Sequence, residues 1–181
     1  MKRTLHTTAL LLLLAAGVVA GVRQLGGREP LPEHALFDRY LGTWAAVVST
    51  EVPGAGQVES QGMERNRLGP GGRWLVTDLQ YKLLGTLYEG QGVLGYDPAK
   101  RAWVQSWVDS TDDALKLAEA RWDPATSTLT LDREFVDTRG RRVAERIVDR
   151  FLDSNTRELT VYNAAADQPE TEAMTIRLRR N

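Results

Sequence analysis

From Thr43 onward, apolar and polar residues alternate along the chain with a period of two, the period of a β-strand that buries one face. The alternating segments are rich in β-branched and aromatic residues, and each is bounded by turn residues. The pattern predicts about ten strands: Thr43–Glu51, Gln57–Leu68, Trp74–Lys82, Leu87–Tyr96, Ala102–Asp109, Leu115–Trp122, Thr128–Val136, Arg142–Phe151, Glu158–Asn163 and Ala173–Arg179.

A different period precedes the first strand. Over Glu33–Leu41 the apolar residues recur at helical spacing and form one stripe: Leu36, Phe37, Tyr40 and Leu41. Pro32 suits the start of a helix, and Gly42 stands where a helix end prefers glycine. We therefore expect one short helix ahead of the strands.

The links between the predicted strands are short, roughly two to six residues, which suits antiparallel neighbours and excludes parallel crossovers. A meander of so many strands has two exposed edges, and closure into a barrel removes both of them. We therefore predict an all-β fold, an up-and-down antiparallel β-barrel of about ten strands with one short N-terminal helix. A β-sandwich is the competing solution.

The N-terminal segment has the pattern of a secretory signal. Lys2 and Arg3 precede the uncharged apolar run Ala9–Ala20, which ends in small residues. The run is shorter than the roughly 20 apolar residues that a spanning helix needs, so we expect cleavage, with an uncleaved anchor as the alternative. The predicted organisation is a signal peptide at 1–20, a linker at 21–32 and the barrel at 33–181, in an exported protein of the periplasm or cell envelope.

Composition narrows the function classes. The 181 residues carry a formal net charge of −1 without a basic stripe, so we expect no nucleic-acid partner. There is no cysteine, which excludes disulfides, thiolate metal sites and thiol redox chemistry. Membrane contact is expected only through an uncleaved N-terminal segment, no cofactor or metal is expected, and the oligomeric state stays open.

Several strands place large aromatic side chains and isolated polar groups on one face. Apolar walls with a few polar groups are typical of a ligand cavity, so we expect a small, largely apolar ligand inside the barrel. The predicted walls are Trp44, Trp74, Tyr88, Trp103 and Trp107, with Asn66, Gln105 and Asp109 as orienting polar contacts. The alternatives are a cofactor-independent enzyme of the isomerase or cyclase type in the same cavity, and a structural barrel without a cavity.

The residues supply no catalytic constellation, and we predict no catalytic residue. His34 is the one histidine after the signal, so a Ser-His-Asp triad has no base among the strands. Asp109, Asp112 and Asp113 lie in and beside a turn, which indicates a solvated loop. Glu145 and Asp149 stand four residues apart on a strand, roughly 13 Å, which is too far for joint acid–base work. We expect this last pair to be surface residues or salt-bridge partners.

Three glycines fall within one predicted strand, at Gly90, Gly92 and Gly95. Glycine in a strand often marks a bend or a close approach of the backbone. Their G-x-G-x-x-G spacing is not a dinucleotide site, because no helix follows to present its N-terminus to a phosphate.

A set of motifs runs through the whole predicted barrel: Leu41-Gly42-Thr43-Trp44, Leu68-Gly69-Pro70-Gly71-Gly72-Arg73-Trp74-Leu75, Tyr88-Glu89-Gly90-Gln91-Gly92-Val93-Leu94-Gly95-Tyr96-Asp97 and Trp103-Val104-Gln105-Ser106-Trp107-Val108-Asp109. Their order resembles the bacterial family called domain of unknown function 1579, from about His34 to Arg179. The resemblance implies no established activity.

The helix followed by Gly42-Thr43-Trp44 also resembles the Gly-x-Trp opening of lipocalins and related calycin barrels. That resemblance implies a structural role for Gly42 and Trp44, with Arg177 or Arg179 packed over the indole as a cation–π contact. It extends to nitrobindin-type haem barrels, which need a histidine on a late strand. The two histidines here are His6 and His34, so we expect no haem.

Overall fold

The computed structural model describes residues 29–165 and 169–181. The predicted signal peptide and residues 21–28 of the predicted linker lie outside this part of the chain. Among the described residues, no helix has the length and apolar character that crossing a membrane requires.

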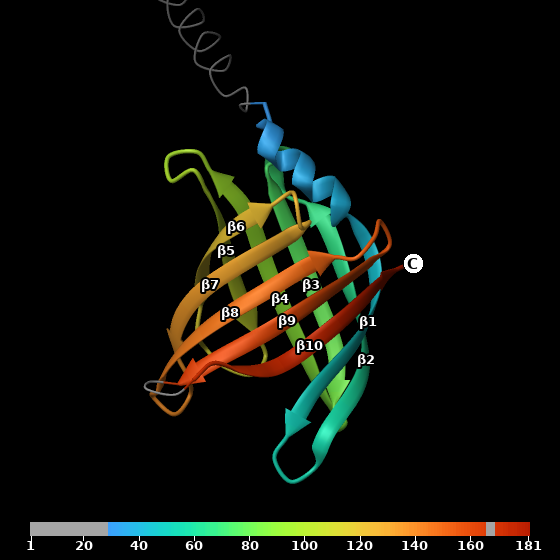
Figure 1. The fold of residues 1–181 in the computed structure, drawn as a ribbon, viewed down its shortest axis with the longest axis vertical. Helices are drawn as coiled ribbons and strands as arrows, with labels where there is room; N and C mark the ends of the chain where they lie inside the picture. The colour runs from blue at the N-terminus through green and yellow to red at the C-terminus, as the bar shows by residue number, and fades with distance from the viewer. Residues whose placement is uncertain (1–28, 166–168) are drawn as a thin grey trace, which may run out of the picture. The chain divides into compact units, whose positions relative to one another are not determined.

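Ten antiparallel strands form one closed barrel (Figure 1). The strands are β1 (Gly42–Val52), β2 (Gly56–Leu68), β3 (Trp74–Leu83), β4 (Thr86–Asp97), β5 (Ala102–Asp109), β6 (Lys116–Asp123), β7 (Thr128–Val136), β8 (Arg142–Phe151), β9 (Thr156–Ala165) and β10 (Thr171–Arg180). Each strand pairs with its neighbours in sequence, and β1 pairs with β10. The predicted up-and-down barrel is confirmed, and the sandwich is excluded.

The first and last strands close the barrel in a regular register, from Trp44 opposite Arg180 to Thr50 opposite Met174. A bulge between Glu172 and Met174 interrupts the pairing of β10 with β9. Closure leaves no free sheet edge among the paired strands, which is how a barrel avoids edge-to-edge association.

A short 3₁₀-helix, η1 (Pro32–Arg39), precedes β1 and lies across one end of the barrel (Figure 1). We call this the helix end and the opposite end the distal end. The helix carries buried Leu36 and Phe37 on its inner side. Gly42 then turns the chain into β1 with a φ of 109°, a conformation that favours glycine. A second 3₁₀ turn, η2 (Pro70–Gly72), joins β2 to β3.

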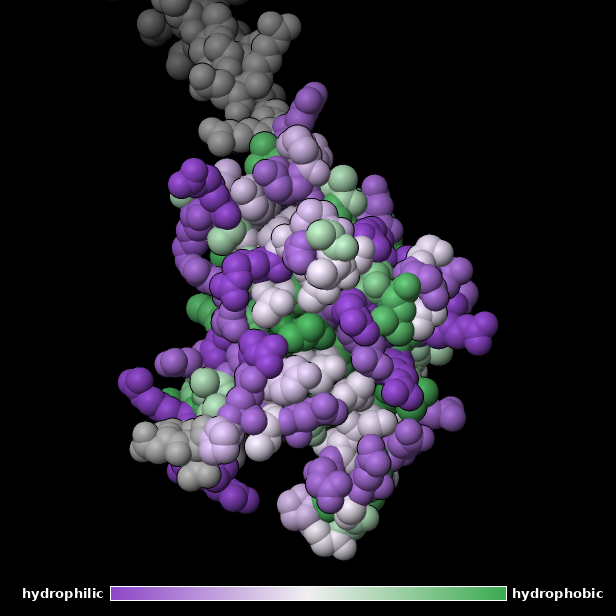
Figure 2. Space-filling view, viewed as in Figure 1, coloured by the Kyte–Doolittle hydropathy of each residue, from purple (hydrophilic) through white to green (hydrophobic). Residues whose placement is uncertain are grey.

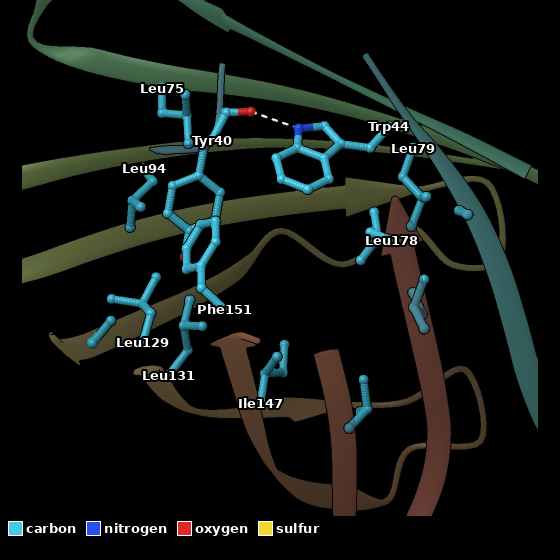
Figure 3. Packing of buried hydrophobic residues seen from close by; sticks show 14 of the residues in the cluster. Tyr40, Trp44, Leu75, Leu79, Leu94, Leu129, Leu131, Ile147, Phe151 and Leu178 are labelled. Atoms are coloured by element: carbon cyan, nitrogen blue, oxygen red, sulfur yellow. Dashed lines mark hydrogen bonds between the residues drawn. The ribbon is translucent and has the colours of Figure 1, made fainter. Parts of the chain in front are cut away.

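Aromatic side chains fill the helix end. Trp44 is fully buried, and its indole N–H donates to the carbonyl oxygen of Tyr40 at 2.7 Å (Figure 3). The ring of Phe151 packs edge-on against Tyr40 at a centroid distance of 4.8 Å. Leucine and isoleucine side chains from several strands continue this core into the barrel (Figure 3). The helix end is therefore closed by packed aromatic rings.

Arg180 and Arg157 both lie over the Trp44 ring, so the prediction of Arg177 or Arg179 for this contact is wrong. The Arg180 guanidinium carbon lies 4.3 Å from the indole centroid, and Nη2 donates to the carbonyl oxygen of Arg39 at 2.7 Å. Inward positions on β10 are even-numbered, so Arg177 and Arg179 face solvent. Trp44 and Gly42 do have the structural positions that the Gly-x-Trp resemblance implies.

The side of the barrel shown in Figure 2 is largely hydrophilic, with hydrophobic side chains in small patches. One exposed aromatic side chain is Trp74 on β3, with 38% of its surface accessible. Its ring lies over Gly95 on β4, where a Cβ atom would come within 2.3 Å of the indole. The prediction that Trp74 lines the interior is therefore wrong, because the strand register turns this side chain outward.

Candidate functional site

The barrel encloses a cavity of about 230 Å³ between the aromatic helix end and the distal end. Most of its wall is apolar and comes from inward-facing positions on six of the strands: Leu75, Leu79, Leu94, Leu129, Leu131, Ile147, Leu159, Val161, Met174 and Ile176. Such a wall favours the apolar part of a small molecule, with the polar groups of the site deciding orientation.

An aromatic group forms the distal part of the wall. Tyr81 and Tyr88 stack with centroids 4.5 Å apart, and the Trp107 indole N–H donates to the Tyr88 hydroxyl at 3.3 Å. The Trp107 ring lies flat against β4, where Cβ atoms on Gly90 and Gly92 would come within 2.3 and 2.7 Å of it. Because Gly90 and Gly92 have no Cβ atoms, the indole has room to lie against the wall and does not project into the middle of the cavity.

A buried ion cluster stands between the cavity and the helix end. The guanidinium of Arg157, on β9, pairs with Glu64 on β2 and with Asp149 on β8, the latter at 2.5 Å. The same guanidinium lies over the rings of Tyr40 and Trp44, at 4.9 and 5.0 Å from their centroids. Arg157 thus holds three strands and the aromatic end together.

The charges of this cluster do not balance, because one guanidinium serves two carboxylates. Burial raises the pKa of Asp149 to about 6, and the neighbouring Glu64 adds to the rise while Arg157 opposes it. The pKa of Arg157 is raised as well, since both carboxylates outweigh its burial. Asp149 is therefore a buried acid that titrates close to neutral pH.

A second ion cluster covers the distal end. The Lys116 ammonium lies 2.7 Å from Asp109 and 2.9 Å from Asp112, and Lys116 and Asp109 are both almost fully buried. Burial opposes the charge on Asp109, but hydrogen bonds from Lys116 and Thr111 lower its pKa below the usual value. The two carboxylates likewise raise the pKa of Lys116 against the effect of burial. Asp109 and Lys116 therefore stay charged at neutral pH.

A third pair provides free hydrogen-bonding capacity. Arg133 on β7 faces Glu145 on β8, with Nε donating to the carboxylate at 2.5 Å. Its side chain is only 7% exposed, yet Nη1 has no hydrogen-bond partner among the described residues. The buried Oε1 of Gln105 on β5 also lacks one within that part of the chain. Both residues line the cavity.

The sequence matches the family described as "Protein of unknown function (DUF1579)" over residues 29–180. The chain belongs to this family. A search of curated protein sequences finds no match to the chain. The match covers the whole described barrel, so the barrel is the DUF1579 domain.

Solved structures share the fold of this DUF1579 barrel at low identity. Rv2717c from M. tuberculosis is 12% identical, with a TM-score of 0.63 over 84% of this chain and 99% of that one. The S-type phycobiliprotein lyase CPES from Guillardia theta is 13% identical, with a TM-score of 0.54 over 83% and 93% of the two chains. At these identities the likeness shows the fold alone.

Of the eight side chains predicted to contact a ligand, four line the cavity of the DUF1579 barrel: Tyr88, Gln105, Trp107 and Asp109. The other four lie elsewhere. Trp44 belongs to the aromatic helix end, and Trp74 faces outward. Trp103 packs against Phe37 of η1 with centroids 5.5 Å apart. Asn66 is buried beside Glu64, to which its amide donates at 2.5 Å. Ligand contact by the first four stays a prediction.

Glu145 and Asp149 were expected to be surface residues or salt-bridge partners. A surface position is wrong, since both are buried inside the barrel, but both are salt-bridge partners. The alternation in β8 already indicated that they are buried, because both share a face with Ile147 and Phe151. Their partners Arg133 and Arg157 were not predicted as site residues, although Arg157 shares the alternation of Leu159 and Val161. Asp109 was also expected in a solvated loop, but its side chain is only 4% exposed.

Proposed function

We propose that this DUF1579 protein binds a small, largely apolar molecule that carries one polar group, inside its barrel. The observation that carries the proposal is the pair of buried atoms, Arg133 Nη1 and Gln105 Oε1, that no described residue satisfies at the wall of an aromatic and aliphatic cavity. An unsatisfied buried polar group costs about 1–3 kcal/mol. A ligand that meets both atoms removes that cost.

The cavity volume sets the size of the enclosed part. A volume of about 230 Å³ exceeds the roughly 150 Å³ of an engineered apolar cavity that takes up benzene. It is below the roughly 300 Å³ at which sites for drug-sized ligands begin. The enclosed part of the ligand is therefore of one- or two-ring size, and the interior is not the solid core of a purely structural barrel.

The charges in the wall favour a neutral polar group. Arg133 is already neutralised by Glu145, and a ligand carboxylate would face that glutamate at close range. A hydroxyl group can accept from Arg133 Nη1 and donate to Gln105 Oε1 at the same time. The ligand class is thus a small aromatic or alicyclic alcohol, or a group with equivalent hydrogen bonding.

Calorimetric titration with naphthalene, 2-naphthol and 2-naphthoate tests this class. We expect 2-naphthol to bind about tenfold more tightly than naphthalene, the equivalent of one to two net hydrogen bonds, and 2-naphthoate to bind most weakly. Gln105→Leu should remove most of the preference for 2-naphthol. Gln80→Leu makes the same change on the outer face of β3 and should leave it intact. Failure of all three probes to bind contradicts the proposal.

The second candidate is a cofactor-independent enzyme in the same cavity. Asp149 lines the cavity and has a raised pKa, and its Oδ1 has no hydrogen-bond partner within residues 29–165 and 169–181. A buried acid near neutral pH is suited to moving a proton on a bound substrate. If a molecule that co-purifies with the protein is converted, as followed by mass spectrometry, Asp149→Asn should abolish the conversion and retain binding. Conversion at an unchanged rate would remove this candidate.

Export is part of the same proposal and is supported by the apolar run Ala9–Ala20 behind a basic start. The intact mass of the protein from the cell envelope fraction tests it. We expect the mass of a chain that begins near Gly21. Recovery of the full-length chain in the cytosol contradicts export, whereas full-length chain in the membrane fraction indicates the anchor.

A further inference from the structure

The barrel wall is not paired along its whole length. Between β6 and β7 the ladder runs from Asp123 opposite Thr128 to Glu119 opposite Asp132. Beyond this point, 116–118 of β6 pair with β5 and 133–136 of β7 pair with β8, but the described strands show no pairing between the two segments. The wall therefore has a window in its distal half, between residues 116–118 and 133–135.

Side chains frame this window. The last paired residues, Glu119 and Asp132, form one border. At the other border the Lys116 ammonium lies 5.0 Å from the centroid of the Phe135 ring, a cation–π contact across the seam. Between them Ala118, with its single methyl group, takes up little space. The window thus results from the missing backbone pairing between β6 and β7, and the contact of Lys116 with Phe135 bridges it at its distal border.

A surface groove lies outside the window. It has a volume of about 870 Å³ and runs over the outer face of β5 to β8. Three inward-facing residues, Gln105, Arg133 and Glu145, line both this groove and the inner cavity. Cavity and groove therefore share residues at the window, among them Arg133 and Gln105, each of which has a buried atom without a hydrogen-bond partner in the described part of the chain.

We infer that the ligand is bipartite: its apolar ring occupies the cavity, its polar group sits at the window, and a further polar chain extends through the window into the groove. This inference rests on the proposed function and deepens it. The observation that carries it is that the residues with free hydrogen-bonding atoms are shared by cavity and groove. A ligand that occupies both the cavity and the groove can be larger than the cavity alone.

Among the described residues, side chains cover both ends of the barrel. Packed aromatic rings with Trp44 close the helix end. At the distal end, the ion cluster of Lys116 with Asp109 and Asp112 covers the cavity beside the stacked rings of Tyr81 and Tyr88. Opening that end means separating buried charges, whereas the window needs no backbone hydrogen bond to break.

The groove also indicates the chemistry of the outer chain. Eight of its nine charged side chains lie in opposite-charge pairs, and Glu134 is the ninth: the pairs are Lys100 with Glu119, Arg121 with Asp132, Arg133 with Glu145, and Arg146 with Glu170. Because the charges compensate one another, the groove does not select a strongly anionic or cationic group. The chain that extends outward is therefore a neutral hydrogen-bonding one, such as a glycol, sugar or amide.

Two probes and one cross-link test the inference. The probes are 2-naphthol and its triethylene glycol ether, which has the same ring with a polar chain. The variant Leu117→Cys/Glu134→Cys places thiols on the outer face at either side of the window, in a chain that has no cysteine of its own. A flexible bis-maleimide then bridges the window. The control pair Gln80→Cys/Glu89→Cys bridges β3 and β4 outside the groove, at positions where these strands are already paired.

In the unmodified protein we expect the ether to bind within about tenfold of 2-naphthol, because the oxygen on its ring still accepts from Arg133 but has no hydrogen to donate to Gln105. Bridging the window should weaken the ether by at least about tenfold and slow 2-naphthol association, with little change in 2-naphthol affinity. The control bridge should change neither. Ala118→Leu narrows the window without a cross-link and should also weaken the ether selectively.

Unchanged binding of the ether after bridging the window overturns the inference. So does failure of the ether to bind the unmodified protein while 2-naphthol binds, an outcome that leaves the proposed function standing. If neither probe binds, the proposed function itself has failed and the bipartite ligand fails with it.

Discussion

Asp149 gives the sharpest test of the buried charges, because its pKa is raised in a site where an ion pair normally lowers it. Raising this pKa from 3.8 to about 6 makes ionisation about 3 kcal/mol harder in the folded protein than in the unfolded chain. The stability that the protonated group contributes is fully present below pH 3.8 and is lost as the pH rises through about 6. Asp149→Asn cannot ionise, so it avoids that loss.

Urea unfolding of the parent protein and of Asp149→Asn, at steps from pH 4 to pH 7.5, measures the effect. The stability of the variant relative to the parent should rise by about 2.5 kcal/mol across this range. Taking the difference between the two proteins cancels the titration of the other groups. Glu64→Gln is the matched background. It removes the second carboxylate, so Arg157 pairs with Asp149 only and the pKa of Asp149 should fall. Adding Asp149→Asn to this background should then give a smaller rise in relative stability with pH. A relative stability that falls with pH would refute the unbalanced cluster.

Three further substitutions test separate parts of the barrel by urea unfolding at pH 7. Arg180→Ala should destabilise by about 2–3 kcal/mol, through the lost carbonyl hydrogen bonds and the cation–π contact, whereas exposed Arg179→Ala should change stability by less than about 0.5 kcal/mol. Gly90→Ala should cost about 1–3 kcal/mol and shift the near-ultraviolet circular dichroism, because Trp107 must move; an unchanged spectrum contradicts that packing. Lys116→Met should cost about 3 kcal/mol by leaving its carboxylates unpaired, and a cost that persists at pH 3 would speak against the ion cluster.

The fold was predictable because one rule, the period of two, holds from Thr43 to Arg179. Short links then force antiparallel neighbours, and closure follows from the need to protect two edges. Two side chains, Arg180 and Trp74, were nevertheless placed wrongly at strand ends, where the alternation is least informative. Arg180 lies one step past the last predicted strand residue, so the alternation was not carried far enough to place its side chain inward. Trp74 begins a strand, where a single aromatic residue fits either face.

The charged interior was harder to predict. Glu145 and Asp149 interrupt an apolar face, and a carboxylate among apolar residues is read as exposed unless its partner is known. The partners Arg133 and Arg157 lie on other strands, and the sequence does not state which positions become cross-strand neighbours. The cavity itself depends on side-chain volumes summed over many strands, and the window depends on where one ladder stops, neither of which has a local signal.

The seam between β1 and β10 joins residues that are more than a hundred positions apart in the chain. Ladder contacts of such long range form late, because the intervening chain must be ordered first. A ribosome that has released only the first nine strands has therefore made a sheet with two open edges and no enclosed interior. The interior is therefore enclosed only once the last strand is available to pair with the first.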